Sequence, residues 1–218
     1  MACRILSVYL FKSNLMIYIL HHVYSYRRKK STMKNLLLLL LLLPLISFGQ
    51  LGDYYNAEGH PKAKGLSFKI KIPLGFEQNE ADRPNIVQKW EKYKTDNDKY
   101  VSLMILVKKF PSEMQGFGID DWTQYLKNDG GVDDLAPDDA YNKKFIVVDN
   151  YPAVSYDCSL EMSRMNLTFI RYMTTIFVPI GDNGFSIMFQ TPSKKLLEEN
   201  KLLLYRLVNS VIFIDQYR

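Results

Sequence analysis

The sequence predicts an α+β fold in which a central, mainly antiparallel sheet has helices packed on it. Two observations support this prediction. The chain after residue 144 contains four successive segments of alternating or continuous apolar residues, separated by turn residues, as is typical of strands. The chain then ends in a segment, 191–209, whose leucines recur at helical spacing. Strands joined by short turns form antiparallel sheets, and such sheets bury an apolar face against helices.

The residues before position 50 are predicted to be a leader rather than part of the folded domain. Residues 33–49 contain Lys34, an unbroken run of eight leucines and small residues before Gln50, which is the pattern of a secretory signal peptide. The apolar stretch of 13 residues, 36–48, is shorter than the roughly 20 that cross a bilayer. We therefore expect cleavage between Gly49 and Gln50, a periplasmic or secreted domain, and no stable membrane insertion after cleavage.

A second apolar stretch, 5–24, precedes this leader and is followed by the basic residues 27–30. A leader rarely needs two apolar cores. Either translation starts at Met33 and residues 1–32 are an over-extended N-terminus, or residues 1–32 are real. In the second case they form an unusually long basic n-region of the leader, or residues 5–24 form a membrane helix that anchors the protein in the inner membrane. We expect the first of these.

Removal of residues 1–49 reverses the sign of the net charge. The chain has 28 basic and 23 acidic residues, and seven of the basic but none of the acidic residues lie in 1–49. The remaining domain therefore carries 21 − 23 = −2. A domain of this charge lacks the basic surface excess that is typical of nucleic-acid binding, so we expect no nucleic-acid partner.

The domain after Gly49 contains one cysteine, Cys158, and one histidine, His60. A single cysteine excludes an internal disulfide, and together the two residues are too few for a zinc site made of nitrogen and sulfur ligands. Because Cys158 alternates with apolar residues, we expect a buried, unreactive thiol. A serine hydrolase would have to use His60 as its base, and the chain has no Gly-x-Ser-x-Gly motif. We expect no cofactor, no metal and no catalytic residue of these kinds.

The first half of the domain is predicted to contain a lead-in and three strands. Residues 50–65 are polar and hold three glycines, so we expect a flexible lead-in to a single globular domain over 66–218. Alternation predicts a strand over 66–73. Two further strands, 86–93 and 99–110, are expected to form a hairpin through the turn residues 95–98.

The run Val101–Val107 within the third predicted strand is apolar on both faces, apart from Ser102. Such a run is typical of a strand whose two faces are both covered. After it, apolar residues at helical spacing and two aspartates in the first turn predict a helix over 119–128.

The second half is predicted to be a four-stranded meander followed by a helix. Gly181-Asp182-Asn183-Gly184 supplies the turn of its last hairpin. The final helix is expected to have Thr191 as its cap and Pro192 at its first position, and 211–214 to add an edge strand. The four strands are expected at 145–149, 153–163, 167–178 and 185–190.

The order strand, hairpin, helix, meander and C-terminal helix resembles the PsbP-like α/β/α sandwich superfamily. The resemblance rests on LSFKIKIPLGF, NYPAVSYDCSL and GFSIMFQTPSKKLLEENKLLLYRLVNSVIF, and it covers roughly residues 66–214. It concerns topology, and it places no functional residue on this chain. The superfamily includes an extrinsic photosystem II subunit and a Ran-binding nuclear transport factor, and the resemblance implies a binding or assembly role.

An acidic segment, 129–139, is the candidate functional region. It lacks the spacing and terminal glutamate of a helix-loop-helix calcium site, so we expect a solvated loop. Two aromatic residues flank it, and we expect them to form the rim of a ligand or partner cleft together with the loop carboxylates. The rim residues are Trp122, Tyr151, Asp133, Asp134, Asp138 and Asp139.

The function that these observations favour is an exported, non-enzymatic binding or assembly factor of the cell envelope, whose partner is a protein or a small molecule. One alternative is an envelope enzyme, a carboxylate-dependent hydrolase that uses the acids of 129–139 and requires a deep pocket holding at least two of them. Another is a membrane-anchored accessory protein, in which the stretch 5–24 is retained.

Export is tested by intact-mass analysis of protein recovered from the soluble envelope fraction of the native host. We expect the mass of residues 50–218, since signal peptidase removes the leader after Gly49. A mass that retains residues 1–32 would contradict export with cleavage and would indicate membrane anchoring.

Overall fold

The computed structural model describes residues 51–218, except 82, 94–99, 129 and 165–166. The chain divides into two units, Met1–Gly49 and Gln50–Arg218, and all described residues belong to the second. The predicted segments 1–32 and 33–49, the turn 95–98 and Asp129 lie outside the described residues.

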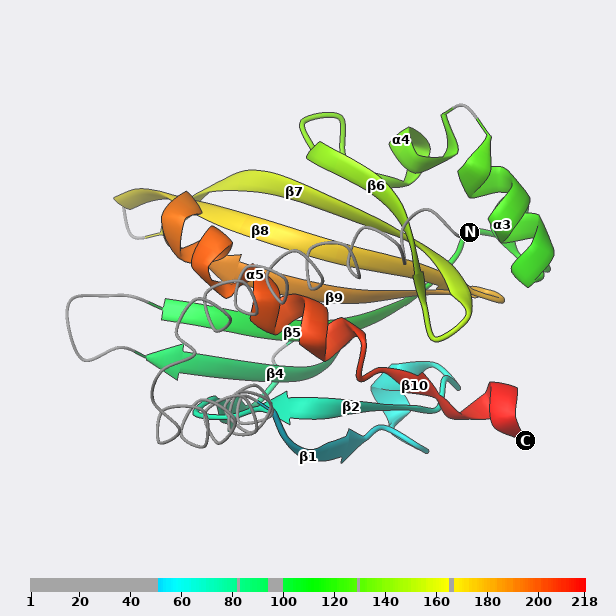
Figure 1. Cartoon of the computed structure of the whole chain (residues 1–218), viewed down its shortest axis with the longest axis horizontal. Coiled ribbons are helices and arrows are strands. Elements are labelled where there is room, and N and C mark those ends of the chain that lie inside the picture. Colours follow the sequence, from blue (N-terminus) through cyan, green and yellow to red (C-terminus); the bar gives the residue numbers. More distant parts are fainter. Residues whose placement is uncertain (1–50, 82, 94–99, 129, 165–166) are drawn as a thin grey trace, which may run out of the picture. The chain divides into compact units, whose positions relative to one another are not determined.

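An antiparallel sheet of seven strands organises the described domain, in the order β3-β4-β5-β9-β8-β7-β6 (Figure 1). The predicted hairpin is β4–β5, and the predicted meander is β6–β7–β8–β9. The mainly antiparallel sheet is thus confirmed, while the short strand β3 was not predicted because its sequence, EQN, has no apolar alternation. The strands are β3 (Glu77–Asn79), β4 (Ile86–Tyr93), β5 (Tyr100–Lys109), β6 (Tyr141–Val148), β7 (Tyr151–Arg164), β8 (Leu167–Ile180) and β9 (Asn183–Thr191).

Two-residue turns set the register of the two hairpins at the ends of the meander. Between β8 and β9, Ile180 pairs with Asn183, and Gly181 begins the turn with φ 52°. Between β6 and β7, Asp149 and Asn150 both have positive φ, 44° and 69°, as a type I′ turn requires. These turns match the right-handed twist of the strands that they join.

A second, three-stranded sheet corrects the predicted start of the domain. Its order is β1 (Leu51–Asn56), β2 (Phe68–Pro73) and β10 (Ile212–Phe213). Residues 50–65 were predicted to be a flexible lead-in, but 51–56 pair antiparallel with β2. This prediction was wrong because β1 is held by pairing with its neighbour, and its own residues show little apolar alternation. The expected C-terminal edge strand is present as β10.

Three α-helices are described. The predicted helix 119–128 is α3 (Ile119–Lys127), and the acidic segment predicted as a loop contains a short helix, α4 (Gly131–Leu135). The C-terminal helix is α5 (Lys194–Val208). Short 3₁₀ turns are η1 (Pro61–Ala63), η2 (Ser112–Met114) and η3 (Ile214–Tyr217).

The cap of α5 is Ser193, whose Oγ accepts a hydrogen bond from the backbone N–H of Leu196 at 3.2 Å. The prediction of Thr191 as the cap was wrong because β9 extends to that residue. Its hydroxyl instead donates to the carbonyl of Ser193 at 2.9 Å. Thr191 therefore supports the connection into the helix without capping it.

None of the helices among the described residues combines the length and the apolarity that crossing a membrane would require.

The main core lies between one face of the seven-stranded sheet, helix α5 and the three-stranded sheet (Figure 1). Phe185 of β9 is its centre, with ring centroids 4.9 Å from Phe68 of β2 and 5.1 Å from Phe213 of β10. Leucines of α5 complete this side. Because side chains alternate along each strand, the remaining residues of the sheet face the opposite side.

Helix α3 covers one end of that opposite face. Trp122 of α3 lies with its ring centroid 5.0 Å from Phe110, which in turn lies 6.0 Å from Phe177 of β8. Gly184 permits this packing, since a Cβ at that position would lie 2.7 Å from the Phe177 ring. Helices thus pack on both faces of the sheet, as the α+β prediction expected.

The C-terminal segment is tied to the β6–β7 turn through Asp149. Its carboxylate accepts hydrogen bonds from the backbone N–H of Phe213 at 2.6 Å and from the Tyr217 hydroxyl at 2.5 Å. The side-chain amide of Gln216 donates to the same carboxylate. These bonds fix the residues after α5, including β10, against the large sheet.

Leu207→Ala is expected to lower the free energy of unfolding by about 2–5 kcal/mol, because Leu207 of α5 is fully buried and its loss leaves a cavity. Leu202→Ala on the same helix is the matched control, since that side chain is 59% exposed and its loss should cost about 0.5 kcal/mol or less. Denaturant titration followed by circular dichroism measures both. Equal losses of unfolding free energy in the two variants would contradict the burial of the Leu207 face of α5.

Candidate functional site

The two aromatic residues predicted to rim a cleft lie in separate aromatic clusters. Trp122 is 1% exposed and packs against Phe110 and Phe117, so it is a core residue and the prediction that it forms a rim was wrong. Tyr151 is half-buried, with its ring 5.1 Å from that of Phe213. Burial, followed by the nearby charge of Asp215, raises the pKa of Tyr151.

The four predicted rim aspartates are exposed. Asp133 forms an ion pair with Lys143 at 2.8 Å, and Asp134 accepts a hydrogen bond from the Tyr125 hydroxyl at 2.8 Å. Asp138 and Asp139 are exposed. Among the described residues, His, Cys, Asp and Glu form no group of three or more that could hold a metal ion. The exposure of these aspartates disfavours the deep acidic pocket that the hydrolase alternative requires.

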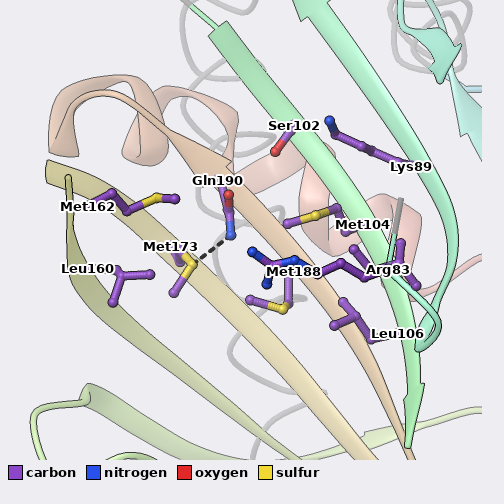
Figure 2. Close-up of a pocket in the computed structure, with 11 residues that line it drawn as sticks. Arg83, Lys89, Ser102, Met104, Leu106, Leu160, Met162, Met173, Met188 and Gln190 are labelled. Carbon is purple, nitrogen blue, oxygen red and sulfur yellow. Dashed lines mark hydrogen bonds between the residues drawn. The ribbon is translucent and has the colours of Figure 1, made fainter. Parts of the chain in front are cut away.

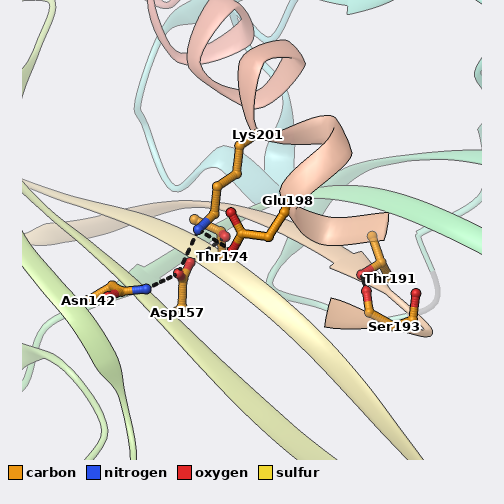
Figure 3. Close-up of polar contacts among 7 residues, drawn as sticks. All are labelled: Asn142, Asp157, Thr174, Thr191, Ser193, Glu198 and Lys201. Carbon is orange, nitrogen blue, oxygen red and sulfur yellow. Dashed lines mark hydrogen bonds and ion pairs between the residues drawn. The ribbon is translucent and has the colours of Figure 1, made fainter. Parts of the chain in front are cut away.

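A buried carboxylate elsewhere, Asp157 of β7, is held by three donors (Figure 3). Thr174 of β8 donates to it at 2.5 Å, Asn142 of β6 at 2.8 Å, and Lys201 of α5 at 3.0 Å. The ammonium of Lys201 also pairs with Glu198 at 2.7 Å. These contacts join three strands to α5.

This network stabilises the packing of α5 on the sheet and is not a reactive site. Asp157 is 3% exposed, and desolvation acts to raise its pKa. The hydrogen bonds from Asn142, Thr174 and Lys201, together with the Lys201 charge, outweigh desolvation and lower the pKa of Asp157. The carboxylate is therefore ionised and fully engaged. The adjacent Cys158 is buried, and desolvation raises the pKa of its thiol to about 11, as expected for an unreactive cysteine.

The candidate functional site is a groove on the sheet face opposite α5, which we call the methionine groove (Figure 2). It has a volume of about 400 Å³, within the range of small-molecule sites. It crosses five adjacent strands, from β4 to β7. The described residues that line it are Arg83, Ile86, Lys89, Ser102, Met104, Leu106, Leu160, Met162, Met173, Met188 and Gln190.

Strand register explains why four methionines meet in this groove. Met104 of β5 is the direct partner of Met188 of β9, and Met173 of β8 is the partner of Gln190, two residues further along β9. Residues two apart on a strand share a face, so these side chains form one continuous surface. Met162 of β7 extends it. Four thioether side chains thus come from four neighbouring strands.

The groove also shows where the expectation for β5 was wrong. The run Val101–Val107 was predicted to be covered on both faces, but only one face, with Leu103 and Ile105, lies in the main core. Met104 and Leu106 of the other face are only half-buried and line the groove. Helix α3 packs on one end of this face. The pattern of apolar residues in β5 predicts that both of its faces are apolar, but it does not predict which element packs on each face.

Sequence reasoning did not find the methionine groove, although one signal was present. Ser102 interrupts an otherwise apolar strand, and Arg83 and Lys89 lie close to the apolar residues of β4. The methionines are spread over residues 104–188, and only the register of β5, β9, β8 and β7 brings them together. A single sequence gives no direct measure of that register.

Asp157→Asn is expected to lower the free energy of unfolding at pH 7 by roughly 1–3 kcal/mol, since it weakens a buried, charge-assisted network. The folded-state pKa of Asp157 is lowered, so its stabilisation is present above the unfolded value and disappears as pH falls through the folded pKa. The difference between wild type and variant should therefore shrink below about pH 4. Denaturant titrations at pH 7, 5 and 3 measure this.

Asp139→Asn, which removes an exposed carboxylate, is the matched control and should leave unfolding unchanged at each pH. If Asp157→Asn lowered the free energy of unfolding by the same amount at pH 7, 5 and 3, the result would contradict an ionised Asp157 in this network.

No protein-family model and no curated protein matches this chain. Among solved structures, it is similar to the cyanobacterial PsbP (CyanoP) of Synechocystis sp. PCC 6803, with a TM-score of 0.44, 10% identity and coverage of 76% of this chain and 94% of that one. It is also similar to the Ran-binding protein Mog1p of Saccharomyces cerevisiae, with a TM-score of 0.42, 10% identity and coverage of 76% and 97%. A third neighbour, from Bacteroides thetaiotaomicron VPI-5482, has a TM-score of 0.35 and 14% identity, with coverage of 67% and 44%.

Likenesses at this level of identity concern the fold alone and assign no partner. The described domain has an α+β fold with an antiparallel sheet and helices on both faces.

Proposed function

We propose that the protein is an exported, non-enzymatic binding factor of the cell envelope whose ligand site is the methionine groove. The observation that carries this proposal is the convergence of seven apolar side chains, four of them methionines, on an open face of the sheet. Contiguous apolar surface that is left open on a folded domain commonly marks an interaction site. The leader at 33–49 supports export.

Methionine suits such a surface. Its side chain is unbranched and its thioether is polarizable, so it adapts to the shape of an apolar ligand. The backbone beneath is rigid, because β5, β9 and β8 each pair with strands on both sides. A fixed backbone with adaptable side chains lowers the ordering cost of binding while tolerating ligands of varied shape.

The lining of the methionine groove favours binding over catalysis. Among the described residues that line it, none is a histidine, cysteine, aspartate or glutamate. Ser102 therefore has no histidine or carboxylate within the groove lining to act as a general base. Arg83 and Lys89 supply charge without a nucleophile. The groove thus offers apolar area and cationic groups, which serve recognition.

Binding at the groove is tested with Nile red, a neutral apolar dye whose fluorescence rises on leaving water. We expect saturable binding of one dye per protein. Met188→Gln and Met104→Gln should each weaken binding by about tenfold, because they replace apolar contact area by an amide that needs hydrogen bonds.

Met114→Gln is the matched control, since Met114 lies in η2 and is not among the lining residues. It should leave the dye affinity unchanged. Binding that is absent, or that all three variants lower equally, would refute the methionine groove as the ligand site. Circular dichroism of each variant establishes that the fold is retained.

A further inference from the structure

The methionine groove contains a cation, the guanidinium of Arg83. Arg83 precedes β4, and Figure 2 shows its side chain reaching into the groove among the methionines. Within the described part of the chain, its guanidinium takes part in no hydrogen bond or ion pair. An uncommitted guanidinium presents several donors in a planar fork that fits a carboxylate or phosphate.

Two polar side chains in the groove also lack strong partners. Ser102 is 1% exposed, and its hydroxyl has no hydrogen-bond partner among the described residues. Leaving a buried hydroxyl unpaired is costly, and a ligand oxygen would relieve that cost. The Gln190 amide donates at 2.9 Å to the sulfur of Met173, which is only a weak acceptor. Both groups would gain from a ligand with acceptor oxygens.

The other charges beside the groove are largely balanced among themselves. Lys89 forms an ion pair with Glu91, which also accepts a hydrogen bond from Tyr93 at 3.1 Å. Arg171 lies over the ring of Phe169 at 5.3 Å, and its charge interacts with that of Glu91. Among the described residues beside the groove, the charge without a partner is therefore that of Arg83. A positive centre within an apolar groove favours a ligand that is apolar along its length and negative at one end.

The dimensions agree with a linear ligand. The groove crosses five strands, and at about 4.8 Å between strands this is roughly 19 Å, comparable with an extended long alkyl chain. Thioether sulfurs can also bind soft cations such as Cu(I), but the Arg83 guanidinium within the same space disfavours a positive ion. An anion with an alkyl chain satisfies both the methionines and the arginine.

We propose that the methionine groove binds a linear anionic amphiphile, a molecule whose negative head pairs with Arg83 while its alkyl chain lies across the methionines. This inference rests on the proposed function, because it names the ligand of the same site. A free fatty acid and the acyl chain of an anionic lipid share this chemistry. Ser102 and Gln190 are hydrogen-bonding groups available to the head.

The test compares two amphiphiles with the same twelve-carbon chain and opposite charge, dodecanoate and dodecyltrimethylammonium. Each displaces Nile red from the full protein at pH 8, below its micelle concentration. We expect dodecanoate to bind at least tenfold more tightly than the cation. Arg83→Gln should lower the affinity for dodecanoate about tenfold, since one charge-assisted contact is removed. The same substitution should not lower the affinity for dodecyltrimethylammonium.

Lys195→Gln is the matched control because its side chain is 88% exposed on α5, which packs on the other face of the sheet. It should retain the preference for dodecanoate. A dodecyl phosphate in place of dodecanoate distinguishes a requirement for a carboxylate from a requirement for any anionic head. Tighter binding of either anion than of the cation, dependent on Arg83, supports the inference.

The outcomes separate this inference from the proposed function. If Nile red binds in the groove but the two charged amphiphiles displace it equally, or Arg83→Gln keeps the preference, the anionic amphiphile is refuted and the apolar groove stands. If Nile red binding is absent or insensitive to the methionine variants, both proposals fail. Arg83 is exposed, and within the described part of the chain its side chain takes part in no hydrogen bond or ion pair, so its replacement should leave the fold intact.

Discussion

The domain depends on one constraint: its seven-stranded sheet carries apolar side chains on both faces, and each face is stabilised by packing against other elements that exclude water. Helix α5 and the three-stranded sheet enclose the face that carries Phe185, Ile187 and Leu103. Helix α3 is shorter and reaches only one end of the other face. The other end of that face carries the methionine groove, whose lining includes four adaptable methionine side chains as well as a serine and a glutamine.

Local sequence patterns predicted most of the fold because the main strands and helices have strong local signals. Alternation identified β2 and β7, and capping with leucine spacing identified α5, although the cap itself is Ser193. The predictions that were wrong concern elements held by their neighbours. Strand β1 has weak alternation and exists through its pairing with β2. Helix α4 is five residues long, and its Gly131 packs against the Tyr125 carbonyl.

The candidate site was less accessible to sequence reasoning, for a physical reason. Proximity in sequence led to Trp122 and the aspartates of 129–139, but Trp122 is an apolar anchor between α3 and the sheet. The residues that gather in space lie on five strands or just before one of them, and they are up to about 107 positions apart, from Arg83 to Gln190. Only strand order and register bring them together, and both depend on long-range pairing that local propensity does not encode.

The three-stranded sheet joins the two ends of the domain, and this has a consequence for the order of folding. Strand β2 pairs with β1 near the start and with β10 near the end, and Asp149 holds the residues around β10 in place. A chain that emerges from its N-terminus can form the meander as soon as β6–β9 are available, since those contacts are local. The small sheet must wait for the last residues. Closure of the main core is therefore a late event, and a nascent chain remains incompletely folded until its final strand is free to pair.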